Sequence, residues 1–440
     1  MSGINMLGNK TDSHRETAPP YPSAAQPDSA LSVEDARRRI AGEIDSVTES
    51  EAVHIRDALE RVLAQDILAP FDVPPHTNSA MDGYAIASID SHPEISSEFN
   101  IIGSSWAGRP YKGAIRPGEA VQIMTGAVMP SGADTVLMQE HVRADADTIR
   151  LNPEYVSIYT KGRNVRAAGE DLAEGALVLR AGRRIAPADL GLLASLGIAE
   201  VRVKRRLRVA FFCTGDELRS LGEPLEEGTI YDSNRYTLYG MLSRPSVEIH
   251  DLGVVADRPE AIRQVFTESS ANSDMVISTG GVSVGEADHV KTVLQELGQV
   301  HFWKIAMKPG HPLAFGRIGP ARFFGLPGNP VAVMVSFYQF VQFALARMAG
   351  ETGPRSAPTQ RVTCLSQLSK RPGRMEFVRG VLKTDPTGKP TVQKTGNQGS
   401  GILHSMSLAN CFIILPEEQV SVAPGDLVEV QAFGGCFERL

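Results

Sequence analysis

Two neighbouring carboxylates stand in a short loop directly after an apolar segment, a combination that can bind a hard cation. The loop is Thr214-Gly215-Asp216-Glu217, and it follows a predicted strand at residues 209–213. Gly215 permits a tight turn, while Asp216 and Glu217 offer the oxygen ligands that Mg²⁺ prefers. The same two acids also suit the first turn of a helix. On these residues alone, a helix start is the simpler interpretation.

A second loop, residues 278–288, could hold a phosphate group. Its glycines would let the backbone approach a phosphate closely, and its N–H groups and hydroxyls supply donors. It has neither the Gly-Lys-Ser/Thr end of a P-loop nor the GxGxxG fingerprint. Binding and purely structural roles are therefore equally open. The residues concerned are Thr279, Gly280, Gly281, Ser283, Gly285 and Asp288.

A pair of lysines, Lys304 and Lys308, lies in a segment that ends in Pro-Gly-His-Pro. Lys304 alternates with apolar Ile305, and Lys308 falls at the end of the predicted strand, so both amines could neutralise a phosphate or another oxyanion. The alternative is a solvated strand face. Further on, Pro327 and Pro330 flank Gly-Asn in a rigid turn before an apolar helix. This turn could present helix N–H groups to an anion, although a structural role is the simpler interpretation.

Two more carboxylates, Asp82 and Asp171, stand in turns far upstream. Asp82 lies in Asn-Ser-Ala-Met-Asp-Gly-Tyr, after a Val-Pro-Pro triplet, and Asp171 ends a Gly-Glu-Asp turn. By default, each is an ordinary turn residue.

The elements that would position the later loops form a parallel sheet. Short apolar strands alternate with helical stretches over residues 207–355, which predicts a doubly wound, three-layer α/β domain with right-handed crossovers. Ligands of such sheets bind beyond the carboxyl ends of the strands, so the acids, glycines and lysines are expected at one edge. The predicted strands are 209–213, Val247–Val255 and 275–278, and the predicted helices are Ser233–Leu242 and 259–269.

Other parts of the chain predict further domains. Residues 1–30 are poor in large apolar side chains and are expected to be a disordered tail. Residues 71–165 alternate short apolar runs with Gly- and Pro-rich turns, which indicates a β-rich insertion domain. The flanking segments, 31–70 and 166–206, would form one discontinuous linker domain, with helices starting at Ser32 and near His54. Residues 356–440 predict a C-terminal β-barrel domain.

Composition argues against several classes of protein. A formal net charge of -7 gives no general attraction to nucleic acid or to an anionic membrane. The most apolar run, residues 331–346, is interrupted by polar residues and predicts a buried helix. The 4 cysteines are widely spaced, and the N-terminus has no apolar signal-peptide core. A soluble enzyme of the reducing cytoplasm is therefore expected.

Taken together, these segments resemble the MoeA-type molybdopterin molybdenumtransferases, whose domains also form the carboxy-terminal part of gephyrin. The resemblance runs in the family's order from about residue 32 to the end of the chain. It rests on Asp-Val-Pro-Pro at 72–75, the turn at 78–84, Met-Thr-Gly-Ala at 124–127, Gly-Glu-Asp at 169–171, Thr-Gly-Asp-Glu-Leu at 214–218, Ser-Asn-Arg at 233–235, the glycine loop at 280–288, the lysine segment at 304–310 and Leu-Pro-Gly-Asn-Pro at 326–330.

The resemblance implies an elongated homodimer that inserts molybdate into adenylylated molybdopterin and releases AMP with the help of Mg²⁺. Asp82 lies on the insertion, so the partner subunit would supply it to a shared site. The molybdopterin adenylyltransferase is a further candidate partner. The implied functional carboxylates are Asp82, Asp171, Glu217, Asp257 and Asp288, and the implied lysines are Lys304 and Lys308. The implied substrate contacts are Thr214, Gly215, Asp216, the loop from Thr279 to Gly285, Pro327, Pro330, Arg166 and Ser400. We expect Asp216, Glu217 and Asp288 to hold the metal.

One position departs from the family pattern. His311 stands where relatives often carry a third lysine, and a neutral imidazole contributes less to oxyanion binding. The affinity for molybdate, or its pH dependence, is the property that this change puts in question.

Three alternative functions stay open. An adenylyltransferase would use ATP and metal-free pterin. A scaffold protein, a role that gephyrin combines with its enzymatic one, would need long interaction segments, and the N-terminal tail is short. A paralogue could insert tungstate, an oxyanion of nearly the same size and charge.

Overall fold

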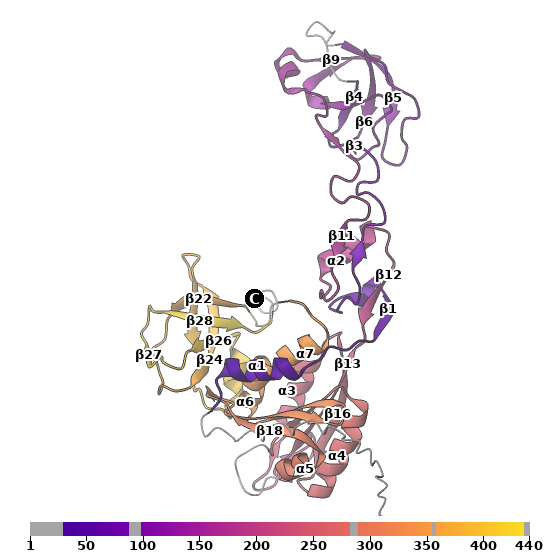
Figure 1. Ribbon diagram of the computed structural model, residues 1–440. Coiled ribbons are helices and arrows are strands. Elements are labelled where there is room, and N and C mark those ends of the chain that lie inside the picture. The colour runs from indigo at the N-terminus through magenta and orange to yellow at the C-terminus, as the bar shows by residue number, and fades with distance from the viewer. Residues whose placement is uncertain (1–29, 88–97, 282–288, 354–357, 435–440) are drawn as a thin grey trace, which may run out of the picture.

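The computed structural model describes residues 30–87, 98–281, 289–353 and 358–434 of the chain, and it is elongated (Figure 1). A β-rich part with β3 to β9 stands at one end. The α/β sheet and a barrel lie together at the other end, and a slender part with β1, β11, β12 and α2 joins the two.

The β-rich part is built on a sheet with the order β7-β4-β6-β5-β9-β8. Side chains alternate between its faces, so one apolar cluster forms around Tyr84 and Phe99 and another around Ala85 and Val121. Where the chain enters and leaves, β3 (Asn78–Ser79) pairs with β10 (Val165–Arg166). The strands of the sheet are β4 (Gly83–Ile86), β5 (Glu98–Ser105), β6 (Glu119–Ile123), β7 (Thr135–Met138), β8 (Val142–Ala144) and β9 (Thr148–Leu151).

The slender part joins segments that are far apart in the sequence. The strand β1 (Ser50–His54) pairs with β12 (Glu200–Lys204), and β2 (Ile67–Leu68) pairs with β11 (Leu177–Leu179). The helix α2 (Pro187–Ser195) packs beside them.

Of the two helices expected in the first segment, the structure has one. The helix α1 (Val33–Glu43) begins at Ser32, whose hydroxyl accepts a 3.0 Å hydrogen bond from the Asp35 N–H. The helix expected near His54 is wrong, because only a 3-10 turn at Ile55–Ala58 follows β1. The chain then turns at Glu60, which has a positive φ of 59°, and forms bridges instead of a helix.

The α/β part confirms the doubly wound architecture. Its sheet has the order β16-β13-β17-β21-β20-β18, with parallel pairing from β16 through β21. One apolar cluster joins α3 and α6 to one face of the sheet, and another joins α4 and α5 to the opposite face. The strands are β13 (Leu207–Thr214), β16 (Val247–Val255), β17 (Met275–Thr279), β18 (Gly298–Lys304), β20 (Pro312–Ile318) and β21 (Ala321–Leu326). The helices are α3 (Ser233–Leu242), α4 (Pro259–Asn272), α5 (His289–Leu297) and α6 (Pro330–Ser336).

The apolar segment after the Leu-Pro-Gly-Asn-Pro turn is a core helix, as expected. It continues from α6 through a π-helical turn (Phe337–Val341) into α7 (Gln342–Met348). Within the described residues, this is the one helix long and apolar enough to cross a membrane, but 67% of its apolar window is buried inside the protein. It therefore belongs to the interior of a soluble protein.

The C-terminal strands close into a barrel. Among the described residues, five strands pair in the order β24-β25-β22-β28-β26, and β26 pairs back with β24. The strand β19 (Met307–Lys308) leaves the α/β part and pairs with β24 at Met375 and Glu376. The barrel strands are β22 (Thr359–Cys364), β24 (Met375–Thr384), β25 (Pro390–Lys394), β26 (Cys411–Leu415) and β28 (Leu427–Ala432). Two short strands, β23 (Leu368–Ser369) and β27 (Ser421–Val422), pair beside it.

Candidate functional site

The carboxyl ends of the parallel strands bring together loops that are distant in the sequence. Asp257 follows β16, the 214–217 loop follows β13, Gly280 and Gly281 follow β17, and Pro327 follows β21. Because β20 is antiparallel to both of its neighbours, β18 also ends at this edge, at Lys304. With neighbouring strands roughly 4.8 Å apart, the edge from β16 to β18 spans roughly 24 Å.

The first loop holds its two carboxylates outward. Asp216 and Glu217 are exposed, and the Leu218 N–H closes the turn on the Gly215 carbonyl at 3.1 Å. A Cβ atom at Gly215 would lie 2.5 Å from Glu217 Oε2, so the carboxylate rests against the bare glycine backbone. A side chain at position 215 would therefore displace the Glu217 carboxylate.

The start of the glycine loop packs directly on the first loop. A Cβ at Gly280 would lie 2.4 Å from the Thr214 carbonyl oxygen, and Gly280 and Gly281 have φ values of 85° and 64°. Only glycine adopts this path readily. The hydroxyls of Thr214 and Ser278 are buried without a hydrogen-bond partner among the described residues, which leaves two donors beneath this edge.

The rest of the predicted glycine loop, with Ser283, Gly285 and Asp288, lies outside the described residues. Among the residues that are described, no group of three or more His, Cys, Asp or Glu side chains could hold a metal. A metal site that includes Asp288 therefore stays a prediction.

The proline-flanked turn is tied to two neighbours, Asn234 and the implied substrate contact Ser400. Asn234 Nδ2 donates a 2.8 Å hydrogen bond to the Gly328 carbonyl, and the Val331 N–H donates to the Ser400 carbonyl at 3.1 Å. Asp232 caps α3 by accepting from the Arg235 N–H at 3.0 Å. The Asp-Ser-Asn sequence at the start of a helix was the available signal, because Asp is a preferred N-cap residue.

The loop that carries Ser400 is held by a buried arginine. The Arg379 guanidinium, which is 1% exposed, donates to the carbonyls of Asn397, Gln398 and Gly399 and to the Ser405 hydroxyl. Burial lowers the pKa of Arg379 to about 10, so the side chain keeps its charge at neutral pH. No sequence pattern indicated this role.

The segment with the two lysines leads from the α/β sheet to the barrel. Lys304 and Lys308 are both exposed, and Lys308 Nζ donates to Glu376 Oε1 at 3.3 Å. His311 Nδ1 lies 2.6 Å from the Ile305 carbonyl oxygen, which assigns the proton to Nδ1 and leaves Nε2 as the free ring nitrogen. His311 thus closes a turn within this segment.

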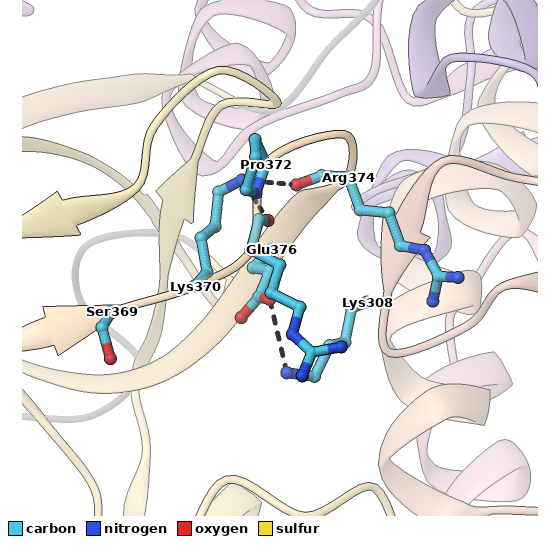
Figure 2. Close-up of a pocket in the computed structure, with 7 residues that line it drawn as sticks. Lys308, Ser369, Lys370, Pro372, Arg374 and Glu376 are labelled. Carbon is cyan, nitrogen blue, oxygen red and sulfur yellow. Dashed lines mark hydrogen bonds and ion pairs between the residues drawn. The ribbon is translucent and has the colours of Figure 1, made fainter.

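Beside Lys308 lies a pocket of 690 Å³ with a strongly basic wall (Figure 2). The loop between β23 and β24 supplies most of this wall, and sequence reasoning missed it. Its basic composition, Lys-Arg-Pro-Gly-Arg, was the available signal. The lining residues are Lys308, Ser369, Lys370, Arg371, Pro372, Arg374 and Glu376.

Asp82 is part of a separate polar cluster in the β-rich part. Its Oδ1 atom accepts hydrogen bonds from the Thr125 N–H and the Thr125 hydroxyl, both at 2.7 Å. These bonds hold the pKa of Asp82 below its ordinary value, the backbone bond having the larger effect. Its other oxygen, Oδ2, takes no part in these two bonds.

The remaining upstream residues lie near the base of the β-rich part. Arg166 is exposed and pairs with Asn78 in the β3–β10 ladder. Asp171 is exposed, and its N–H donates to the Val73 carbonyl at 3.0 Å. The slender part separates β3 and β4 from the α/β sheet (Figure 1). One chain therefore does not bring Asp82 and the strand edge together.

Comparison with known proteins gives a consistent result along the chain. Residues 31–197 match the MoeA N-terminal region (domain I and II), residues 210–347 a probable molybdopterin binding domain, and residues 361–433 the MoeA C-terminal region (domain IV). The molybdopterin molybdenumtransferase of Haemophilus influenzae is 40% identical over 92% of this chain and 98% of its own length. That of Nostoc sp. is 34% identical over 87% of this chain and 88% of its own length. The solved structure of the molybdopterin biosynthesis MoeA protein from Pyrococcus horikoshii OT3 has a TM-score of 0.79 and 30% identity, covering 92% of this chain and 100% of that one.

Proposed function

Since this chain belongs to the MoeA family and acts in molybdenum cofactor biosynthesis as a molybdopterin molybdenumtransferase, we propose how it performs the reaction. It inserts molybdate into adenylylated molybdopterin and releases AMP. The observation that carries this proposal is the edge of the sheet at the carboxyl ends of its parallel strands. Acidic side chains, glycine backbone and Lys304 lie along this edge, and the basic pocket lies beside Lys308, four residues after Lys304.

The glycine backbone would bind the pyrophosphate. Gly280 lies against Thr214 at the tips of β13 and β17, and its N–H donates to the Leu326 carbonyl at 3.2 Å. Gly281 follows with a φ of 64°, and its N–H and those of the residues after it would meet the dianionic group. The predicted loop continues through Ser283 and Gly285. The unpartnered hydroxyls of Thr214 and Ser278 support a polar ligand at this place.

Asp216 and Glu217, together with Asp288, would hold Mg²⁺. The exposed carboxylates of Asp216 and Glu217 are hard oxygen ligands and fit this ion. When bound, Mg²⁺ offsets phosphate charge and polarises the scissile anhydride. Asp257 follows β16, the strand next to β13, and would orient the substrate from the side of the 214–217 loop away from the glycines.

Molybdate would bind on the side of the lysines. Lys304 ends β18 at the strand edge, and Lys308 leads to the basic pocket with Arg371 and Arg374. Cations with several N–H donors suit a tetrahedral dianion. The loop of Ser400, tied to Val331 by a hydrogen bond, connects the pocket's barrel with the proline-flanked turn of Pro327 and Pro330.

Asp82, and with it Asp171 and Arg166, would come from a second copy of the chain. Within one chain the slender part holds the β-rich part away from the strand edge, so a shared site requires a homodimer (Figure 1). Large apolar side chains exposed around α3 and its neighbouring loops support a protein contact there. They are Leu221, Leu225, Ile230, Tyr236 and Tyr239.

We also propose that the enzyme works in the cytoplasm and receives its substrate from a molybdopterin adenylyltransferase. Among the described cysteines, Cys213, Cys364 and Cys411 are free and buried, which suits a reducing compartment. Burial raises the pKa of all three thiols, that of Cys411 to about 12, so they stay protonated.

Two incubations of the purified protein test the reaction class. With adenylylated molybdopterin, Mg²⁺ and molybdate, we expect AMP release, and with ATP and metal-free molybdopterin we expect no ATP consumption. The opposite pattern would identify an adenylyltransferase. The variants Glu217→Gln and Asp288→Asn should keep the fold and lose AMP release, and full turnover by both would remove these residues from the mechanism.

A further inference from the structure

The basic pocket contains one cation that differs from the others. Arg371, Arg374 and Lys308 are exposed, whereas Lys370 is buried, with 8% of its surface accessible. The four residues line the same wall, in and beside the loop that joins β23 to β24 (Figure 2). Because Lys370 is buried while the other three cations are exposed, we expect its role to differ from direct binding of a ligand.

All of the hydrogen-bonding capacity of the Lys370 ammonium is turned inward. Its Nζ donates to the carbonyl oxygens of Arg374 at 2.8 Å, Glu417 at 3.0 Å and Arg371 at 3.3 Å. An ammonium has three N–H donors, so none is left for a ligand in the pocket. The backbone of Lys370 is fixed as well, because its N–H donates to the Val420 carbonyl at 2.9 Å.

These bonds determine how the loop folds. Nζ draws in the carbonyls of Arg371 and Arg374, the two ends of the Arg-Pro-Gly-Arg turn, and it shares the Glu417 carbonyl with the Gly373 N–H. Gly373 has a φ of 93°, which completes the turn. With both carbonyls held inward, the exposed arginine side chains lie on the outside of the turn, at the pocket.

The charge of Lys370 is not cancelled by a carboxylate. Its described partners are all neutral carbonyls, and the nearby Glu376 carboxylate bonds to Lys308 instead. Burying an ammonium without a counter-ion is costly unless something offsets it. A bound dianion in the pocket would supply the missing negative charge.

We propose that Lys370 is a positioning residue for oxyanion binding: it organises the Arg371–Arg374 turn and adds a buried positive charge without touching the anion. This inference rests on the proposed function, because it assigns molybdate to the pocket beside Lys308. The direct ligands are then Lys308, Arg371 and Arg374.

Direct binding of molybdate to the protein alone, measured by titration calorimetry, tests this role independently of turnover. We expect Lys370→Met, which keeps the length of the side chain but removes its charge, to weaken molybdate binding about tenfold, the effect of one lost charge-assisted hydrogen bond at the arginines. Lys370→Arg retains the charge and can still donate to carbonyls, so it should recover most of the affinity. In the AMP-release assay, Lys370→Met should raise the half-saturating molybdate concentration and leave the maximal rate within about twofold, because Lys370 does not touch the reacting atoms.

The control is Val430→Ala, which removes buried volume from the barrel core away from the loop. It should lower the melting temperature and leave molybdate binding unchanged. The inference is overturned if Lys370→Met binds molybdate as the parent does, or if Val430→Ala loses the same affinity at an equal loss of stability. If molybdate binding depends on Lys370 but the parent protein releases no AMP, the role of Lys370 stands and the proposed function fails.

Discussion

Lys308 and Glu376 should have opposite effects on molybdate binding, although they form one ion pair. Lys308 Nζ lies 3.3 Å from Glu376 Oε1, with 60% of the lysine side chain and 14% of the glutamate side chain exposed. An anion that binds Lys308 must compete with this carboxylate. Such an exposed pair is worth about 0.2–1 kcal/mol, whereas a hydrogen bond from an ammonium to an anion is worth about 1.5–3 kcal/mol.

The magnitudes follow from the difference between these energies. In the Lys308→Ala variant the hydrogen bond to the anion is lost, but binding no longer requires breaking the ion pair with Glu376. The net loss of binding free energy is about 1–2 kcal/mol. The half-saturating molybdate concentration should therefore rise roughly five- to thirtyfold. Glu376→Gln frees the lysine and should lower that concentration by up to about fivefold. The assay is the molybdate dependence of AMP release at saturating adenylylated molybdopterin.

A matched control removes the same charge elsewhere in the barrel. Asp385 lies beyond the far end of β24, about 30 Å along the strand from Glu376. Asp385→Asn should leave the molybdate dependence unchanged. A rise in the half-saturating concentration for Glu376→Gln, in the same direction as for Lys308→Ala, would mean that the Glu376 carboxylate does not compete with molybdate for Lys308.

Three further predictions concern the carboxylates. Thr125→Val removes the hydroxyl, one of the two donors that hold the pKa of Asp82 down, so this pKa should rise. The acidic limb of the pH–rate profile should then move to higher pH. An unmoved limb would mean that Asp82 does not titrate during turnover. Arg205 makes two bonds to Asp274, at 2.7 and 2.8 Å, and side-chain hydrogen bonds from Arg205 lower the pKa of Asp274 against the effect of burial. Asp274→Asn should therefore cost about 1.5–3 kcal/mol of unfolding free energy at pH 7. Because the pKa of Asp274 in the folded protein lies below its ordinary value of 3.8, the difference should persist down to that pH and disappear only as the pH falls through the lowered pKa. Equal urea midpoints at pH 7 would contradict this. Mixing Asp82→Asn and Glu217→Gln subunits should restore about a quarter of the parent's sites if each site uses two chains, and no recovery after subunit exchange would argue for a site within one chain.

The sequence predicted the parts of the fold that depend on local pattern. The helix at Ser233–Leu242 and the strand at Val247–Val255 have the expected bounds, because a cap and a run of apolar residues mark them. The helix expected near His54 is wrong, because Val62 and Leu63 form bridges with the distant Arg184 and Val203, and these pairings prevailed over a local helical pattern. Parallel pairing also brings the expected loops to one edge.

The basic pocket was not predictable in the same way. Lys308 meets Glu376 across 68 positions of sequence, and the Arg371–Arg374 turn is organised by the buried Lys370. Neither contact leaves a periodic pattern in the sequence. Arg379 likewise supports the loop of Ser400 from inside the barrel, where the sequence shows only an arginine in a strand.

In the proposed mechanism, molybdate insertion and AMP release are one reaction at the same site. A single-turnover experiment with the purified protein, adenylylated molybdopterin and Mg²⁺ tests it most directly, with AMP and molybdenum-loaded pterin counted together as molybdate is titrated. We expect both products to appear in equal amounts, and only when molybdate is present. AMP released in full without molybdate, or molybdenum inserted with the adenylyl group still attached, would contradict it.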